Sequence, residues 1–106
     1  MENRVVITGI GIYSCIGKNL EEVRQSLFEG KSGIIFSPER KAFGYRSGLT
    51  GFVEKPNLKS ELDRRARIMM PEHAEYAYMS TKKAMQVAGL DEDYFEAHEV
   101  GIIYGN

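Results

Sequence analysis

The residues best suited to chemistry in this chain of 106 residues are three arginines in the short segment Asp63-Arg64-Arg65-Ala66-Arg67. If the segment is helical, Arg64 and Arg67 stand three positions apart and share one face. A guanidinium group binds phosphate or carboxylate through two parallel hydrogen bonds, so such a face is typical of a site for an anionic group. Arg46 and Lys59 could add positive charge from the preceding loop.

The same arginines have a simpler interpretation, which the residues taken alone favour. A helix face rich in arginine is often only solvated, and here Glu61 or Asp63 could pair with the guanidinium groups. The sequence therefore suggests an anion-binding site at these arginines but does not favour it over a solvated helix face.

No other residues form a convincing catalytic or metal-binding set. Cys15 is the only cysteine, and a nucleophilic cysteine needs a nearby base or a helix terminus that stabilises the thiolate. No histidine is close to it in sequence, so we interpret Cys15 as a small packed thiol. His73 and His98 are not spaced as metal ligands with Cys15. We therefore predict no catalytic residue and no metal site within residues 1–106.

A glycine cluster near the start offers an alternative function. Gly9-Ile10-Gly11 supplies the first two glycines of a dinucleotide-binding fingerprint, but Ser14 stands where the third glycine belongs. The next helix also begins late, at Asn19. We favour the interpretation that these glycines allow close packing between a strand and a helix.

Two apolar segments, residues 4–9 and 100–105, have the pattern of strands buried on both faces. Such strands need neighbouring strands and covering layers, which the rest of the chain supplies only in part. The sequence therefore predicts an α/β fold in which this chain is a fragment, a proteolytic remnant, or a piece completed by another polypeptide.

Local signals predict several helices around these segments. Asn19 and Glu22 form a capping box, and Gly30 is placed to end the helix that they begin. The expected helices cover residues 19–29, 61–70, Pro71 to Gly89 and a short turn at about 92–96 capped by Asp91. Residues 31–57 are expected to be a loop with one or two short strands.

The longest predicted helix has one face of small residues, so it should pack closely against a helix or a sheet. The residues expected on its other, polar side are Glu75, Lys82, Lys83 and Gln86.

Composition narrows the classes of function. The net charge is −1 and 42% of the residues are hydrophobic, which argues against a general binder of nucleic acid or of a membrane surface. No stretch approaches the roughly 20 apolar residues of a membrane span, and no signal peptide is recognisable. These features predict a cytoplasmic protein.

The order of several motifs resembles the amino-terminal part of the β-ketoacyl-acyl carrier protein synthases. The similar segments are Val6-Ile7-Thr8-Gly9-Ile10-Gly11-Ile12, Glu29-Gly30-Lys31-Ser32-Gly33-Ile34, Ala84-Met85-Gln86-Val87-Ala88-Gly89-Leu90 and Val100-Gly101-Ile102-Ile103-Tyr104-Gly105. Phe36-Ser37 and Tyr45-Arg46-Ser47 are similar to the type I branch in particular.

The resemblance implies a thiolase-like fold with layers in the order α-β-α-β-α. Residues 1–106 would then be an incomplete amino-terminal part of its first half, without an internal domain boundary. It also implies fatty acid elongation by decarboxylative Claisen condensation with malonyl-acyl carrier protein, in an enzyme that is usually a homodimer and has no cofactor of its own. The family's catalytic motifs are absent from this chain, which we therefore expect to be inactive alone.

The resemblance also gives the basic residues a partner, because basic residues near the mouth of the family's tunnel bind the acidic acyl carrier protein. Arg46, Arg64 and Arg65 match such positions, and Arg67 is included although the type I pattern has its basic residue one position later, at Ile68. A second hypothesis is a non-catalytic subunit that binds the carrier or determines chain length.

Overall fold

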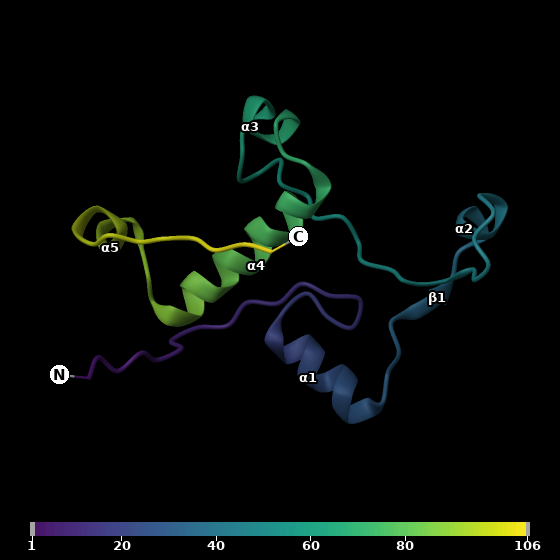
Figure 1. The fold of residues 1–106 in the computed structure, drawn as a ribbon, viewed down its shortest axis with the longest axis horizontal. Coiled ribbons are helices and arrows are strands. Elements are labelled where there is room, and N and C mark those ends of the chain that lie inside the picture. The colour runs from purple at the N-terminus through teal and green to yellow at the C-terminus, as the bar shows by residue number, and fades with distance from the viewer. Residues whose placement is uncertain (1, 106) are drawn as a thin grey trace. The chain divides into compact units, whose positions relative to one another are not determined.

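The computed structural model describes residues 2–105, whose fold is drawn as a ribbon in Figure 1. The contacts within the chain divide it into two units. One unit combines the residues up to Ile12 with those from Lys55 onward, and the other is Tyr13–Glu54. The elements in chain order are α1 (Leu20–Glu29), β1 (Ile34–Phe36), α2 (Pro38–Ala42), β2 (Leu49–Gly51), α3 (Arg64–Ile68), α4 (Glu72–Ala88) and α5 (Glu92–Ala97).

Helix α1 begins and ends where its capping residues predict. The Asn19 side chain accepts a hydrogen bond from the Glu22 amide at 2.9 Å, and Gly30 ends the helix in the left-handed conformation with φ 64°. The Glu22 carboxylate accepts from the Lys18 amide at 2.7 Å, one residue earlier than a standard capping box requires.

The loop after α1 contains a small hairpin. Strands β1 and β2 are antiparallel, with Ile35 opposite Thr50, which confirms the expectation of short strands. Between them lies α2, which the sequence analysis did not predict. Its signal was present, since Ser37 caps the helix and Pro38 occupies its first position.

The other unit is built on α4, the longest helix. Gly89 ends α4 in the left-handed conformation with φ 71°, as predicted, and Pro71 stands just before its first turn. Helices α3 and α5 are shorter, and Asp63 and Asp91 precede them as N-caps. The side chain of each aspartate accepts a hydrogen bond from the amide three residues on.

The glycine cluster packs against α4. A Cβ atom added at Gly9 would lie 2.9 Å from the Ala88 Cβ, and one added at Gly11 would lie 2.7 Å from the Ala84 nitrogen. These contacts leave no room for a side chain. They confirm the packing interpretation of the glycines and the close packing expected on the small-residue face of α4.

The prediction of buried strands at 4–9 and 100–105 is wrong for this structure. Both segments are extended without strand pairing, and Val5 is 92% and Ile102 80% exposed. The described residues offer these segments no neighbouring strand, and a strand exists only where a ladder of hydrogen bonds can form. The observed fold is a helix-rich α/β arrangement with a sheet of two strands.

Few side chains of the described residues are buried. Leu58 is the buried hydrophobic residue, and Ser26 and Glu75 are the buried polar ones. None of the helices within residues 2–105 combines the length and apolar character that a membrane crossing requires.

Candidate functional site

Helix α3 presents the three arginines directly after its cap. Asp63 accepts a hydrogen bond from the Ala66 amide at 2.7 Å, which fixes the first turn. Arg64 and Arg67 line one depression of about 460 Å³, whereas Arg65 is not among its lining residues. The structure thus confirms that Arg64 and Arg67 share a face.

The lining of the depression contains more cationic than anionic side chains. Lys55 and Lys59 line it together with Arg64 and Arg67, and Glu75 of α4 is its acidic member. Such an arrangement attracts a carboxylate or phosphate group through charge-assisted hydrogen bonds.

The acidic residues near α3 do not neutralise its arginines. Glu61 pairs instead with Lys82 of α4 at 2.8 Å, and Asp63 is occupied as a helix cap. Among residues 2–105, no carboxylate lies within ion-pair distance of Arg64 or Arg65. The alternative in which Glu61 or Asp63 pairs with the arginines is therefore wrong.

The remaining two candidates are placed differently. Arg67 donates from Nε to the Leu62 carbonyl at 3.2 Å, so one N–H group of its guanidinium is already hydrogen-bonded to the loop before α3. Arg46 lies between α2 and β2, in the other unit, and does not line the depression.

Glu75 departs from its predicted place on the polar side of α4. It is buried, with its side chain 12% exposed, and its Oε2 lies 3.4 Å from the Lys55 ammonium. Helix periodicity could not reveal this burial, because Lys55 is distant in sequence and comes from a loop.

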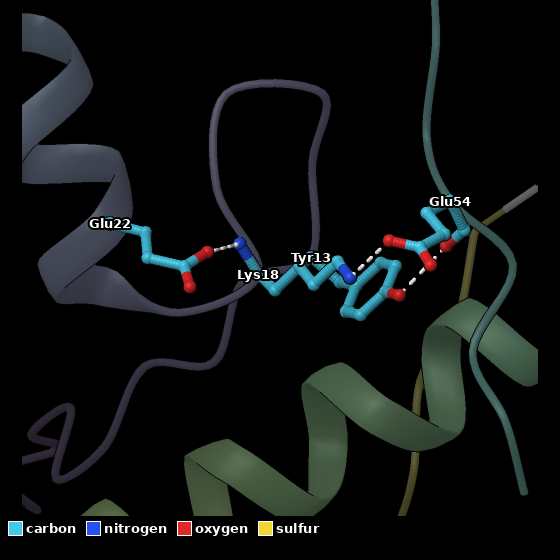
Figure 2. Close-up of polar contacts among 4 residues, drawn as sticks. All are labelled: Tyr13, Lys18, Glu22 and Glu54. Carbon is cyan, nitrogen blue, oxygen red and sulfur yellow. Dashed lines mark hydrogen bonds and ion pairs between the residues drawn. The ribbon is translucent and has the colours of Figure 1, made fainter.

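A second polar cluster, in the unit Tyr13–Glu54, was also missed by the sequence analysis (Figure 2). Lys18 joins two carboxylates: its backbone amide donates to Glu22, and its ammonium donates to Glu54. The Tyr13 hydroxyl donates to the Glu54 carbonyl at 2.7 Å. The cluster therefore ties the turn before α1 to the end of the hairpin.

The pKa values of Tyr13, Lys18 and Glu54 in this cluster are all shifted. The hydrogen bond between Lys18 and Glu54 raises the pKa of the lysine and lowers the pKa of the carboxyl. Burial is the main cause of the raised pKa of Tyr13. All three shifts favour the protonation states found at neutral pH.

We expect Lys18→Met to cause a small decrease in Tm near neutral pH and a much smaller one well below pH 4.5. The lowered pKa of Glu54 means that its contribution is present above the ordinary value of 4.5 and is lost as the pH falls through the folded-state pKa. The pKa of Lys18 is raised, so at high pH the contribution of this lysine to stability is lost. The loss occurs as the pH rises above 10.5 and through the folded-state pKa of Lys18. Thermal unfolding followed by circular dichroism measures both. An equal decrease at both acidic and neutral pH would show that the lysine acts through packing alone.

Cys15 occupies a packing position, whereas His73 and His98 are exposed and stack on tyrosine rings. Cys15 is half-buried, and its Sγ would lie 2.8 Å from a Cβ added at Gly33. His73 stacks on Tyr104 with ring centroids 6.1 Å apart, and His98 stacks on Tyr94 at 4.1 Å. No group of three or more potential metal ligands is present in the described part of the chain.

Comparison with known proteins identifies the class to which the chain belongs. The family described as "Beta-ketoacyl synthase, N-terminal domain" matches residues 2–106. Because this match covers nearly the whole sequence, the chain belongs to the β-ketoacyl synthase family through its amino-terminal domain.

Individual relatives show which members of this family the chain resembles. The chain is 43% identical over 102 residues to "3-oxoacyl-[acyl-carrier-protein] synthase 1" of Haemophilus influenzae, covering 96% of the chain and 25% of the relative. It is 42% identical over 104 residues to the synthase 1 of Escherichia coli K12, covering 97% and 25%. Identity to the "3-oxoacyl-[acyl-carrier-protein] synthase 2" of Staphylococcus aureus COL is 27% over 103 residues, again 97% and 25%. The chain thus spans about a quarter of the length of these relatives.

Proposed function

We propose that residues 1–106 form the amino-terminal part of a 3-oxoacyl-acyl carrier protein synthase that elongates acyl chains in fatty acid synthesis. The observation that supports this most is collinear identity above 40% along nearly the whole chain with two synthases of type 1. The identity to the type 2 synthase is lower, so the type 1 branch is the better comparison.

The reaction that this proposal implies has two parts. An acyl group passes from the carrier thioester to an active-site cysteine, and the carrier thiol leaves. Malonyl-acyl carrier protein then loses carbon dioxide, its carbanion attacks the acyl thioester, and the cysteine thiolate leaves. Two histidines and backbone amides assist in the family, and none of these groups is assigned to residues 1–106.

The part of this function proposed for the present chain is contact with the acyl carrier protein. Arg64 and Arg65 carry it because they have no ion-pair partner among the described residues, and Arg67 and Arg46 are weaker candidates. The carrier is acidic, so exposed guanidinium groups would attract and orient it. A homodimer, a cytoplasmic location and the layered thiolase-like fold belong to the same proposal.

A condensation assay tests the function. The protein as its own gene encodes it is mixed with acyl-acyl carrier protein and malonyl-acyl carrier protein, and the product is followed by intact mass. We expect 3-oxoacyl-acyl carrier protein, lengthened by two carbons, and release of carbon dioxide. Malonyl-acyl carrier protein alone is the control. Carrier binding without any condensation would instead support the non-catalytic subunit.

A further inference from the structure

Two ion pairs join the loop before α3 to helix α4. The Lys55 ammonium lies 3.4 Å from the Glu75 carboxylate, and the Lys82 ammonium lies 2.8 Å from the Glu61 carboxylate. Glu75 and Lys82 are seven residues apart, or two helical turns, and therefore lie on one face of α4. We call this loop, residues 55–62, the clamped loop.

The two ion pairs have opposite arrangements of charge, so together they favour one direction of the loop along α4. The loop contributes the cation to the first pair and the anion to the second. If the loop ran in the opposite direction along α4, Lys55 would face Lys82 and Glu61 would face Glu75. Like charges at these positions would repel, so the observed direction of the loop is the one that places opposite charges together in both pairs.

The part of the loop between the two ion pairs is also held in place. Leu58 is 3% exposed, and its carbonyl accepts hydrogen bonds from the amides of Glu61 and Leu62. The Leu62 carbonyl in turn accepts from Arg67 Nε, and Asp63 caps α3 in the next position. The clamped loop is thus continuous, through short contacts, with the helix that carries the arginines.

We propose that Lys55, Glu61, Glu75 and Lys82 are positioning residues that hold α3 in the orientation in which its arginines bind an acidic partner. This inference rests on the proposed function, because the partner is the acyl carrier protein. The four residues act through Arg64 and Arg65, the two arginines proposed to contact the carrier.

The charge of one positioning residue makes a sharp test possible. Glu61→Lys makes the surface near α3 more positive, so simple long-range attraction predicts tighter binding of an acidic carrier. Loss of the ion pair, with repulsion from Lys82, predicts weaker binding. We expect the dissociation constant to rise about three- to tenfold in Glu61→Lys. The Glu61→Lys/Lys82→Glu exchange should restore it to within about twofold of the original value.

The measurement is titration calorimetry with purified acyl carrier protein at low salt, using the protein as its own gene encodes it. Glu96→Lys is the matched control, because it makes the same charge change on exposed α5, where no ion pair with Glu96 is found among residues 2–105. If Glu61→Lys does not fold, Glu61→Gln removes the pair without repulsion, and a rise of about twofold is expected.

The outcomes separate the two levels of inference. Unchanged or tighter binding in Glu61→Lys, or no recovery in the exchanged pair, overturns the positioning role while leaving the proposed function intact. A change in Tm without a change in affinity gives the pairs a purely structural role and also overturns it. Absence of carrier binding in the original protein overturns the proposed function, and the positioning role with it.

Discussion

Replacing Gly11 with alanine is expected to destabilise the unit that contains α4 by about 2–3 kcal/mol. A Cβ atom at this position would lie 2.7 Å from the Ala84 nitrogen and 2.8 Å from the Ser80 carbonyl carbon. Both neighbours are backbone atoms of a regular helix, which cannot move aside as a flexible side chain can. The added atom must therefore push residues 9–12 away from α4, and the contacts of Gly9 with Ala84 and Ala88 would be lost too.

The size of this effect is large for the unit concerned. Small domains are stabilised by only about 5–15 kcal/mol in total, and the described residues bury few apolar side chains. We expect faster hydrogen exchange of the α4 amides, measured by mass spectrometry under native conditions, and a lower midpoint of unfolding in urea.

Gly101→Ala is the matched control for Gly11→Ala. No atom lies within 4 Å of a Cβ added at Gly101, and its φ is not positive. Replacing such a glycine reduces the entropy of the unfolded chain, so this variant should be neutral or slightly stabilised. Equal exchange rates in the two variants would show that the contact between the glycines and α4 does not stabilise the unit.

The second large effect is expected at the basic face of α3. Reversing Arg64 and Arg65 to glutamate should weaken binding of the acyl carrier protein about 10- to 100-fold while the fold survives. Each arginine is exposed, so its replacement removes no core contact. A charge-assisted hydrogen bond contributes about 1.5–3 kcal/mol, and the reversed charge adds repulsion toward an acidic partner.

Titration calorimetry at low salt measures the affinity for the carrier. The same titration at higher salt measures how strongly that affinity depends on salt. Binding that depends on exposed charges weakens as salt rises, and the reversed variant should lose much of that dependence. The control is Arg24→Glu/Lys31→Glu, which makes the same change in net charge on the other unit. Unchanged affinity in the α3 variant would remove the carrier role from Arg64 and Arg65.

Features set by neighbouring residues were predicted well from the sequence. The caps at Asn19 and Asp91 and the helix ends at Gly30 and Gly89 depend on one side chain or one φ angle within a few residues. The close packing of Gly9 and Gly11 was also foreseen, because two glycines so near each other suggest a close approach.

Features that depend on distant partners were predicted poorly. An apolar segment such as Val5 to Ile7 has the composition of a strand, but its state is decided by whether another strand lies beside it. Glu75 was placed among solvated residues because helical periodicity describes one helix, whereas its ion-pair partner Lys55 comes from a loop distant in sequence. The freedom of Arg64 from ion pairs likewise depends on Lys82, which attracts Glu61.

The order in which the two units can form follows from their arrangement along the chain. The unit Tyr13–Glu54 is continuous in sequence, whereas the other is interrupted by it. Residues 9–11 therefore leave the ribosome long before Ala84 and Ala88 of α4, by roughly 4–15 seconds at synthesis rates of about 5–20 residues per second. The hairpin and α1 have time to fold in that interval. Residues 9–11 meanwhile lack the helix against which they pack, so the unit that contains them can form only after α4 has been synthesised.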